Sequence, residues 1–132
     1  MGDRGNIYVK QNGGKDAGIY LYGHWSGHKI PVLLRDALKR GESRWDDEQY
    51  LTRIIFDGLR GGDDDLTGFG ISTYPCDNER KLLVVDAESQ TVSVSEFPWT
   101  EGGQIAALTF KQYIALSDTK AREFRDGPSE SE

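Results

Sequence analysis

The chain has 132 residues, of which 36% are hydrophobic and 29% are charged, and its formal net charge at pH 7 is −6. This length fits a single domain, no apolar run approaches the roughly 18 residues of a membrane-spanning helix, and the negative charge argues against binding to duplex nucleic acid. The single cysteine, Cys76, excludes an internal disulfide and a multi-cysteine zinc site.

The first predicted elements are two strands joined by a tight turn. Apolar and polar side chains alternate over residues 4–10 and 18–22, which is the period of a β-strand. Between them, Asn12-Gly13-Gly14 supplies residues that tolerate the positive φ angles of a turn. We therefore expect an antiparallel hairpin.

Two helices are predicted next. Residues 30–40 carry apolar side chains at helical spacing, with Pro31 in the first turn and a glycine after the last. A second apolar stripe begins near residue 50 and ends near residue 60, where glycines follow. Its acidic start complements the helix dipole, and Asp46 with Gln49 resembles a capping box. The short link between the two helices indicates that they pack as neighbours.

The second half of the chain predicts three more strands and one short helix. Residues 69–74 and 91–97 alternate, whereas 81–86 are continuously apolar in the middle, as in a central strand buried on both faces. The turn after 81–86 predicts that this strand and the next form a hairpin. Residues 109–117 are expected to form a short helix with Thr109 as its N-cap.

Together these elements predict an α+β fold in a single domain. We expect a mainly antiparallel sheet of about five strands, with the inserted pair of helices packed on one face and a short C-terminal helix. Polar Thr, Ser and Tyr positions on the other face predict partial exposure or a concave binding surface. The globular domain should span residues 1–125, and the polar residues 126–132 should form a flexible acidic tail.

The segment after the second strand carries the candidate binding site. It leaves a strand and enters a helix, and a helix N-terminus offers N–H groups and positive partial charge that suit a phosphate or a carboxylate. His24, Trp25, Ser26 and His28 are therefore predicted to bind a small anionic ligand. Two alternatives stay open. Trp25 fills the rim of the core while His24 bonds locally, or the histidines hold a metal, although the glycine between them disfavours the helix that such a site needs.

The other polar clusters have simpler explanations. Asp46 and Asp47 suit a helix start better than acid–base chemistry, and residues 63–65 lack the spacing of a calcium loop. Cys76 would act as a nucleophile only beside a histidine, and nothing in the sequence shows that the two meet. Asn78 is assigned to the ligand site because its turn follows a strand that we expect to end where the histidine loop lies.

We expect His24, Trp25 and Asn78 to lie near Gly61, at the end of the second helix. The second helix should run antiparallel to the first. Arg44, in the link between them, should therefore lie at the end of the domain away from His24 and have a structural role.

Three groups of segments occur in a specific order: residues 19–27, then Arg44-Trp45-Asp46-Asp47 with residues 50–56, then residues 68–73 with Asp77-Asn78-Glu79. In this order the chain resembles a family of small uncharacterised proteins from bacteriophages and from bacteria, chiefly actinobacteria. The resemblance covers roughly residues 4–95. It implies a small intracellular protein with a phage context, and it assigns no activity and no catalytic residue.

We therefore expect a cytoplasmic binding protein with no cofactor, no metal and no catalytic residue, whose ligand is a small anion such as a nucleotide. The chain start lacks the apolar stretch of a secretion signal. The alternative is an acidic interaction protein that binds and modulates a host macromolecule, with its charge steering the encounter. An enzyme that uses Cys76 or His24 is less consistent with the sequence, because no nucleophile–base pair occurs at a diagnostic spacing.

Overall fold

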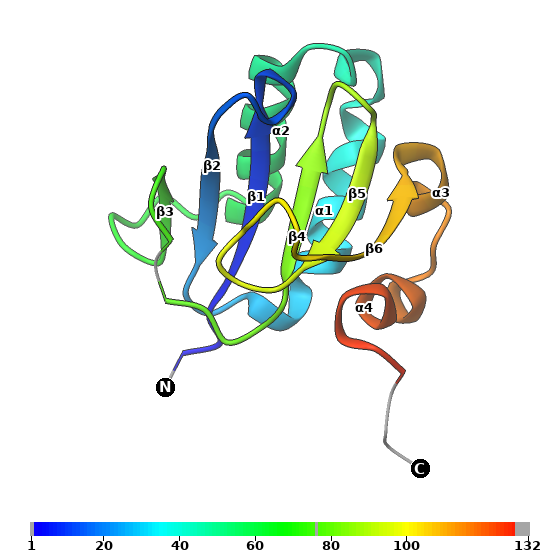
Figure 1. The fold of residues 1–132 in the computed structure, drawn as a ribbon. Helices are drawn as coiled ribbons and strands as arrows, with labels where there is room; N and C mark the ends of the chain where they lie inside the picture. The colour runs from blue at the N-terminus through cyan, green and yellow to red at the C-terminus, as the bar shows by residue number, and fades with distance from the viewer. Residues whose placement is uncertain (1, 76, 129–132) are drawn as a thin grey trace.

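One six-stranded sheet forms the centre of the molecule (Figure 1). The structure is a computed structural model and describes residues 2–75 and 77–128. In spatial order the strands are β3 (Phe69–Ser72), β2 (Asp16–Gly23), β1 (Gly5–Gln11), β4 (Leu82–Asp86), β5 (Thr91–Ser95) and β6 (Gln104–Thr109). Neighbouring strands are antiparallel except β1 and β4, which run parallel at the centre of the sheet. The predicted α+β class and mainly antiparallel sheet are confirmed, and β6 is a strand that the sequence did not predict.

The described residues form four α-helices: α1 (Ile30–Arg40), α2 (Glu48–Arg60), α3 (Phe110–Ile114) and α4 (Asp118–Asp126). The bounds of α1 are those predicted, and Thr109 caps α3 in a capping box with Gln112, as expected for its N-cap. The expected cap of α2 is wrong by one residue. Asp47, not Asp46, has the extended backbone of an N-cap and accepts the N–H of Tyr50.

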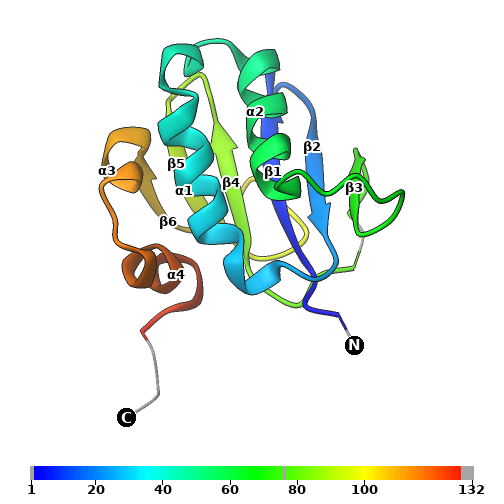
Figure 2. The same cartoon turned by 180° about the vertical axis from the view of Figure 1, so that it is seen from behind.

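The pair α1 and α2 covers one face of the sheet (Figure 2), and the main core lies between these two layers. Trp45, in the link between the helices, is buried and packs edge-on against Phe110, with 5.2 Å between ring centroids. Its indole N–H donates to the carbonyl of Leu38. Trp45 therefore fastens the end of α1 to α3 and belongs to the fold.

The opposite face carries a smaller aromatic core beneath the loop between β5 and β6. Tyr8 stacks on Trp99 with 4.9 Å between ring centroids. The hydroxyl of Tyr20 accepts a hydrogen bond from the backbone N–H of Trp99. Phe97 packs against the same cluster. In Figure 1 this loop crosses in front of the sheet. It covers the middle of the face that the sequence pattern suggested as a concave binding surface.

Helix α4 packs beside α1 and is held by a buried arginine. Arg125 is 2% exposed, donates to the carbonyl of Gly27 at 2.7 Å and pairs with Asp126. Asp126, the first residue of the expected tail, is the last residue of α4, and residues 129–132 lie outside the described part of the chain. Among the described residues, no helix has the length and apolar character needed to cross a membrane.

Candidate functional site

The loop with the predicted ligand residues lies at one end of the sheet, where β2 ends and where β1 and β4 begin. A short 3-10 turn, Gly27–Lys29, leads from this loop into α1. We call this region the polar end, because polar side chains from three segments of the chain meet there: Asp3, His24, His28, Asn78 and Arg80.

Asp3 occupies the position that an anion would take at the start of α1. Its carboxylate accepts the backbone N–H of His28 at 3.0 Å and also contacts the Nδ1 of that residue, while its carbonyl accepts the N–H of Gly27. Arg80 donates two hydrogen bonds to the other carboxylate oxygen, at 3.1 and 2.8 Å. Burial alone would raise the pKa of Asp3, but the hydrogen bonds from His28 and Arg80 outweigh it and lower the pKa.

The next N–H groups at this helix start are also used. Lys29 donates to the carbonyl of Ser26, Ile30 donates to the carbonyl of Gly27, and Pro31 has no N–H. An external anion would therefore have to displace Asp3 before it reached free donors. The small anionic ligand stays a prediction, and the geometry of this helix start does not favour it.

The three consecutive residues of the predicted site have different surroundings. His24 shares a hydrogen bond with the hydroxyl of Tyr22 through its Nδ1, at 2.7 Å. The ring of Trp25 packs edge-on against His24 and is more than half exposed. The hydroxyl of Ser26 is buried beside Gly23 and has no hydrogen-bond partner among the described residues. His24 therefore bonds locally, as one alternative expected, but Trp25 is exposed and does not fill the rim of the core as the same alternative required.

Asn78 lies at the same end of the sheet but has its own partners. Asn6, which is buried, donates its side-chain N–H to the Oδ1 of Asn78 at 3.2 Å. Asn78 also lines an open surface pocket of about 420 Å³, together with Glu79, Arg80, Lys81, Glu96 and Phe97. Two basic and two acidic side chains balance the charge of this pocket, so it does not select an anion.

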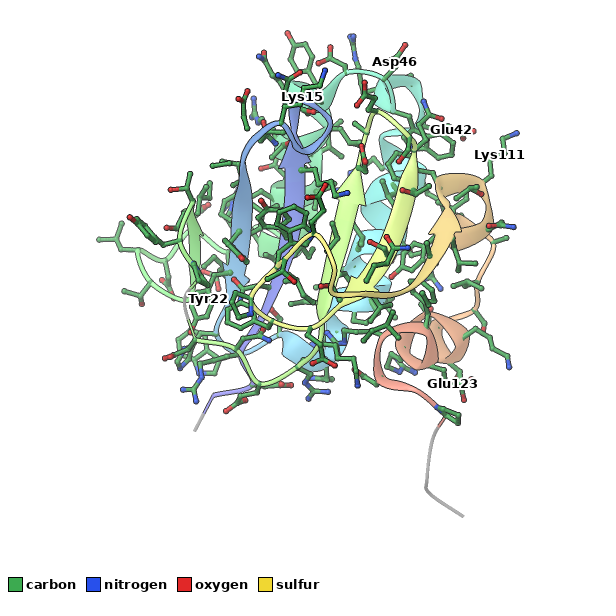
Figure 3. The ribbon with its side chains drawn as sticks, in the orientation of Figure 1. Lys15, Tyr22, Glu42, Asp46, Lys111 and Glu123 are labelled. Carbon is green, nitrogen blue, oxygen red and sulfur yellow. The ribbon has the colours of Figure 1, made fainter. Side chains whose placement is uncertain are left out.

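Arg44 lies away from the polar end. It is ion-paired with Asp47 at 3.8 Å, and its guanidinium lies over the ring of Tyr50. Figure 3 shows the neighbouring Glu42 and Asp46 at the end of the molecule opposite Tyr22. By contrast, Leu59, in the last turn of α2, lies close to Gly23. This is the arrangement expected for the helix pair, and it leaves Arg44 out of the polar end.

The remaining sequence candidates add no chemistry to this picture. Among the described residues, no group of three or more His, Cys, Asp or Glu side chains could hold a metal ion. In the loop of residues 63–65, Asp64 pairs with Arg60, and the Oδ1 of Asp63 accepts the N–H of Asp65. Cys76 lies outside the described residues, so its predicted role is untested.

Four exposed apolar side chains lie on β3 or on the loops around it, and β3 is the first strand in the sheet order and therefore one of its edges. Trp25, Leu66, Ile71 and Tyr74 have exposed fractions of 56%, 99%, 59% and 78%. We call these four residues the β3 edge surface. Trp25 lies over Gly68, where an added Cβ would be only 2.6 Å from the indole ring. Exposed apolar surface that is concentrated in one region marks interaction sites, which makes these residues candidates for one.

Comparison with protein-family models, with curated proteins and with solved structures found no match to this chain. The resemblance to a phage and actinobacterial family stays a prediction.

Sequence reasoning missed Asp3, Arg80 and most of the β3 edge surface. Asp3 meets His28 and Arg80 only through contacts between distant segments, for which no local pattern exists. Leu66 had a signal in the sequence, because it is an isolated apolar residue after three aspartates in a loop without hydrophobic periodicity. A residue of that kind has no predicted core to enter.

Proposed function

We propose that this chain is an acidic interaction protein that binds a macromolecular partner through the β3 edge surface. The observation that carries the proposal is the exposure of four large apolar side chains beside one edge strand. Leu66 is the clearest case, because it is 99% exposed and gains no packing within the described chain. Burial of such side chains by a partner would supply roughly 25 cal/mol for each Å² of apolar surface covered.

The charge beside this surface indicates the chemistry of the partner. Asp65 directly precedes Leu66, and Asp63 lies two residues before Asp65. Neither carboxylate forms an ion pair with any described residue, and the chain as a whole carries a net charge of −6. A partner with apolar anchors flanked by Lys or Arg would match both features, and its charge would speed the encounter. A host protein is the kind of partner that the resemblance to phage proteins implies.

Site-specific photo-crosslinking tests the proposal. A benzophenone amino acid at position 66 or 74 should crosslink one partner in a lysate of the producing cells, whereas the same probe at Lys111 should not. Lys111 is exposed and lies at the opposite edge of the sheet (Figure 3). Equal crosslinking from all three positions, or none from positions 66 and 74, would contradict the proposal.

Leu66→Ser supplies the matched binding test. The substitution should leave the melting temperature unchanged, because Leu66 has no packing to lose, and it should weaken partner binding at least tenfold. Leu116→Ser is unsuitable as a control because Leu116 packs against the core. Lys39→Ser, on the exposed side of α1, is the control that should change neither quantity.

A further inference from the structure

The backbone of β3 has one side paired and one side free. In the β2–β3 pair, Tyr22 lies opposite Gly70 and Leu21 opposite Ile71. The N–H of His24 donates to the carbonyl of Gly68, which fixes the alternation along β3. In an antiparallel pair, every second residue directs its N–H and C=O to the neighbour. Gly70 and Ser72 therefore bond to β2, while the groups of Phe69 and Ile71 face away from the sheet.

This edge strand is short, with four residues, but it lacks the other common protections against pairing. Natural edge strands carry charged residues, proline or a bulge that blocks another strand, and Phe69–Ser72 contains no charge and no proline and pairs with β2 in unbroken register. At the other edge, β6 has an irregular register near Ser95, and the N–H of Thr109 is taken by the side chain of Gln112. β6 also carries no charge and no proline, so the unbroken register of β3 is the feature that distinguishes the two edges.

We infer that the partner contributes an extended segment that pairs with β3 as an additional edge strand, and this inference rests on the proposed function. The loop of residues 61–68 extends outward beyond β3 before it returns to the strand (Figures 1 and 2), and it contains Asp63 and Asp65, so the segment that leads into this edge is acidic. Ile71 shares the sheet face of Leu21, on the side of α2.

The register defines the chemistry of the incoming segment. Side chains alternate between the two faces of a strand, so every second residue of the segment would pack beside Ile71 on the helix side. Those residues are apolar. Lys or Arg at the other positions would match the negative charge of the loop that holds Asp63 and Asp65. The expected ligand is an extended peptide in which apolar and basic residues alternate.

A displayed library of random dodecapeptides, selected on the immobilised full chain, tests this inference. The selected peptides should alternate apolar and basic residues, and addition of one such peptide should slow hydrogen exchange at the Phe69 and Ile71 amides. Selection of acidic peptides, selection of peptides with helical periodicity, or no enrichment over empty beads would overturn it.

Substitution of Ile71 separates backbone pairing from side-chain contact. Ile71→Ala and Ile71→Pro both remove the side chain, but only proline also removes the outward N–H, which no described residue uses. Ile71→Pro should bind the selected peptide at least tenfold more weakly than Ile71→Ala. A selected peptide N-methylated at alternate residues should bind the unsubstituted chain equally weakly, which keeps the test valid if the proline variant fails to fold. Equal binding in both comparisons would overturn strand addition.

The two proposals fail in different ways. If crosslinking from position 66 persists while Ile71→Pro and N-methylation have no effect, the interaction surface stands and strand pairing is wrong. If crosslinking from position 66 is absent as well, both proposals are wrong.

Discussion

Asp3 makes hydrogen bonds to four residues of the polar end. Its carboxylate accepts from His28 and Arg80, and its backbone bonds to His24 and Gly27. Asp3→Asn should destabilise the fold by about 1 to 2 kcal/mol at neutral pH, since it removes charge-assisted hydrogen bonds from a partly exposed site. Urea unfolding of both proteins measures this difference.

The same substitution has a defined pH dependence. The pKa of Asp3 is lowered below its ordinary value of 3.8, so its contribution is present above that pH and is lost as the pH falls through the lowered value. The stability difference between the unsubstituted chain and Asp3→Asn should be full at pH 7 and should shrink at pH values below about 4. A difference that stays undiminished at pH values well below about 4 would contradict this role.

Gly68 is the second residue whose identity the structure requires. Its φ is 101°, and an added Cβ would collide with the Trp25 ring. Gly68→Ala should destabilise the fold by roughly 1 to 3 kcal/mol and displace Trp25. Gly62→Ala is the control, because Gly62 also has a positive φ, 87°, but an added Cβ there would meet no atom within 4 Å. Chemical denaturation of both variants should show the larger loss for Gly68→Ala.

At the scale of the element, the start of α2 offers two adjacent aspartates with different roles. Asp47→Ala should cost about 1 kcal/mol, because it removes the side chain that accepts the N–H of Tyr50. Asp46→Ala removes a charge near the helix start but no capping hydrogen bond, so its cost should be only a few tenths of a kcal/mol. Thermal unfolding of the two variants measures the difference, and a larger loss for Asp46→Ala would show that the cap is misassigned.

Helix α4 depends on Arg125 for its attachment. Arg125→Met would leave the buried carbonyl of Gly27 without this donor, and the expected loss of stability is about 2 kcal/mol. Arg122→Met, on the exposed side of the same helix, should change stability by less than about 0.5 kcal/mol. Hydrogen exchange should show that α4 opens more readily in Arg125→Met only; equal opening in both variants would contradict this role.

At the scale of the whole molecule, local pattern predicted the first half of the fold well and the C-terminal part poorly. The bounds of α1 agree with prediction because its apolar residues follow one clear period. The strand β6 was missed because Ile105, Ala106, Ala107 and Leu108 do not alternate in polarity. The helix α4 was missed because its buried face includes the charged Arg125. The candidate site required contacts such as Asp3 with Arg80, which only the folded chain creates.

The parallel pairing of β1 with β4 also sets an order of events during protein synthesis. β1 leaves the ribosome about 75 residues before β4, and its Ile7–Val9 segment has no partner on that side until Leu83–Val85 arrives. The nascent chain can form β2, α1, α2 and β3 before β4 is made. Until then β1, which is central in the finished sheet, is an exposed edge strand. A released fragment of residues 1–72 should therefore aggregate, as light scattering would show, and a fragment of residues 73–132 added early should suppress it. Slow translation between residues 72 and 86 would lengthen the period in which the chain needs a chaperone.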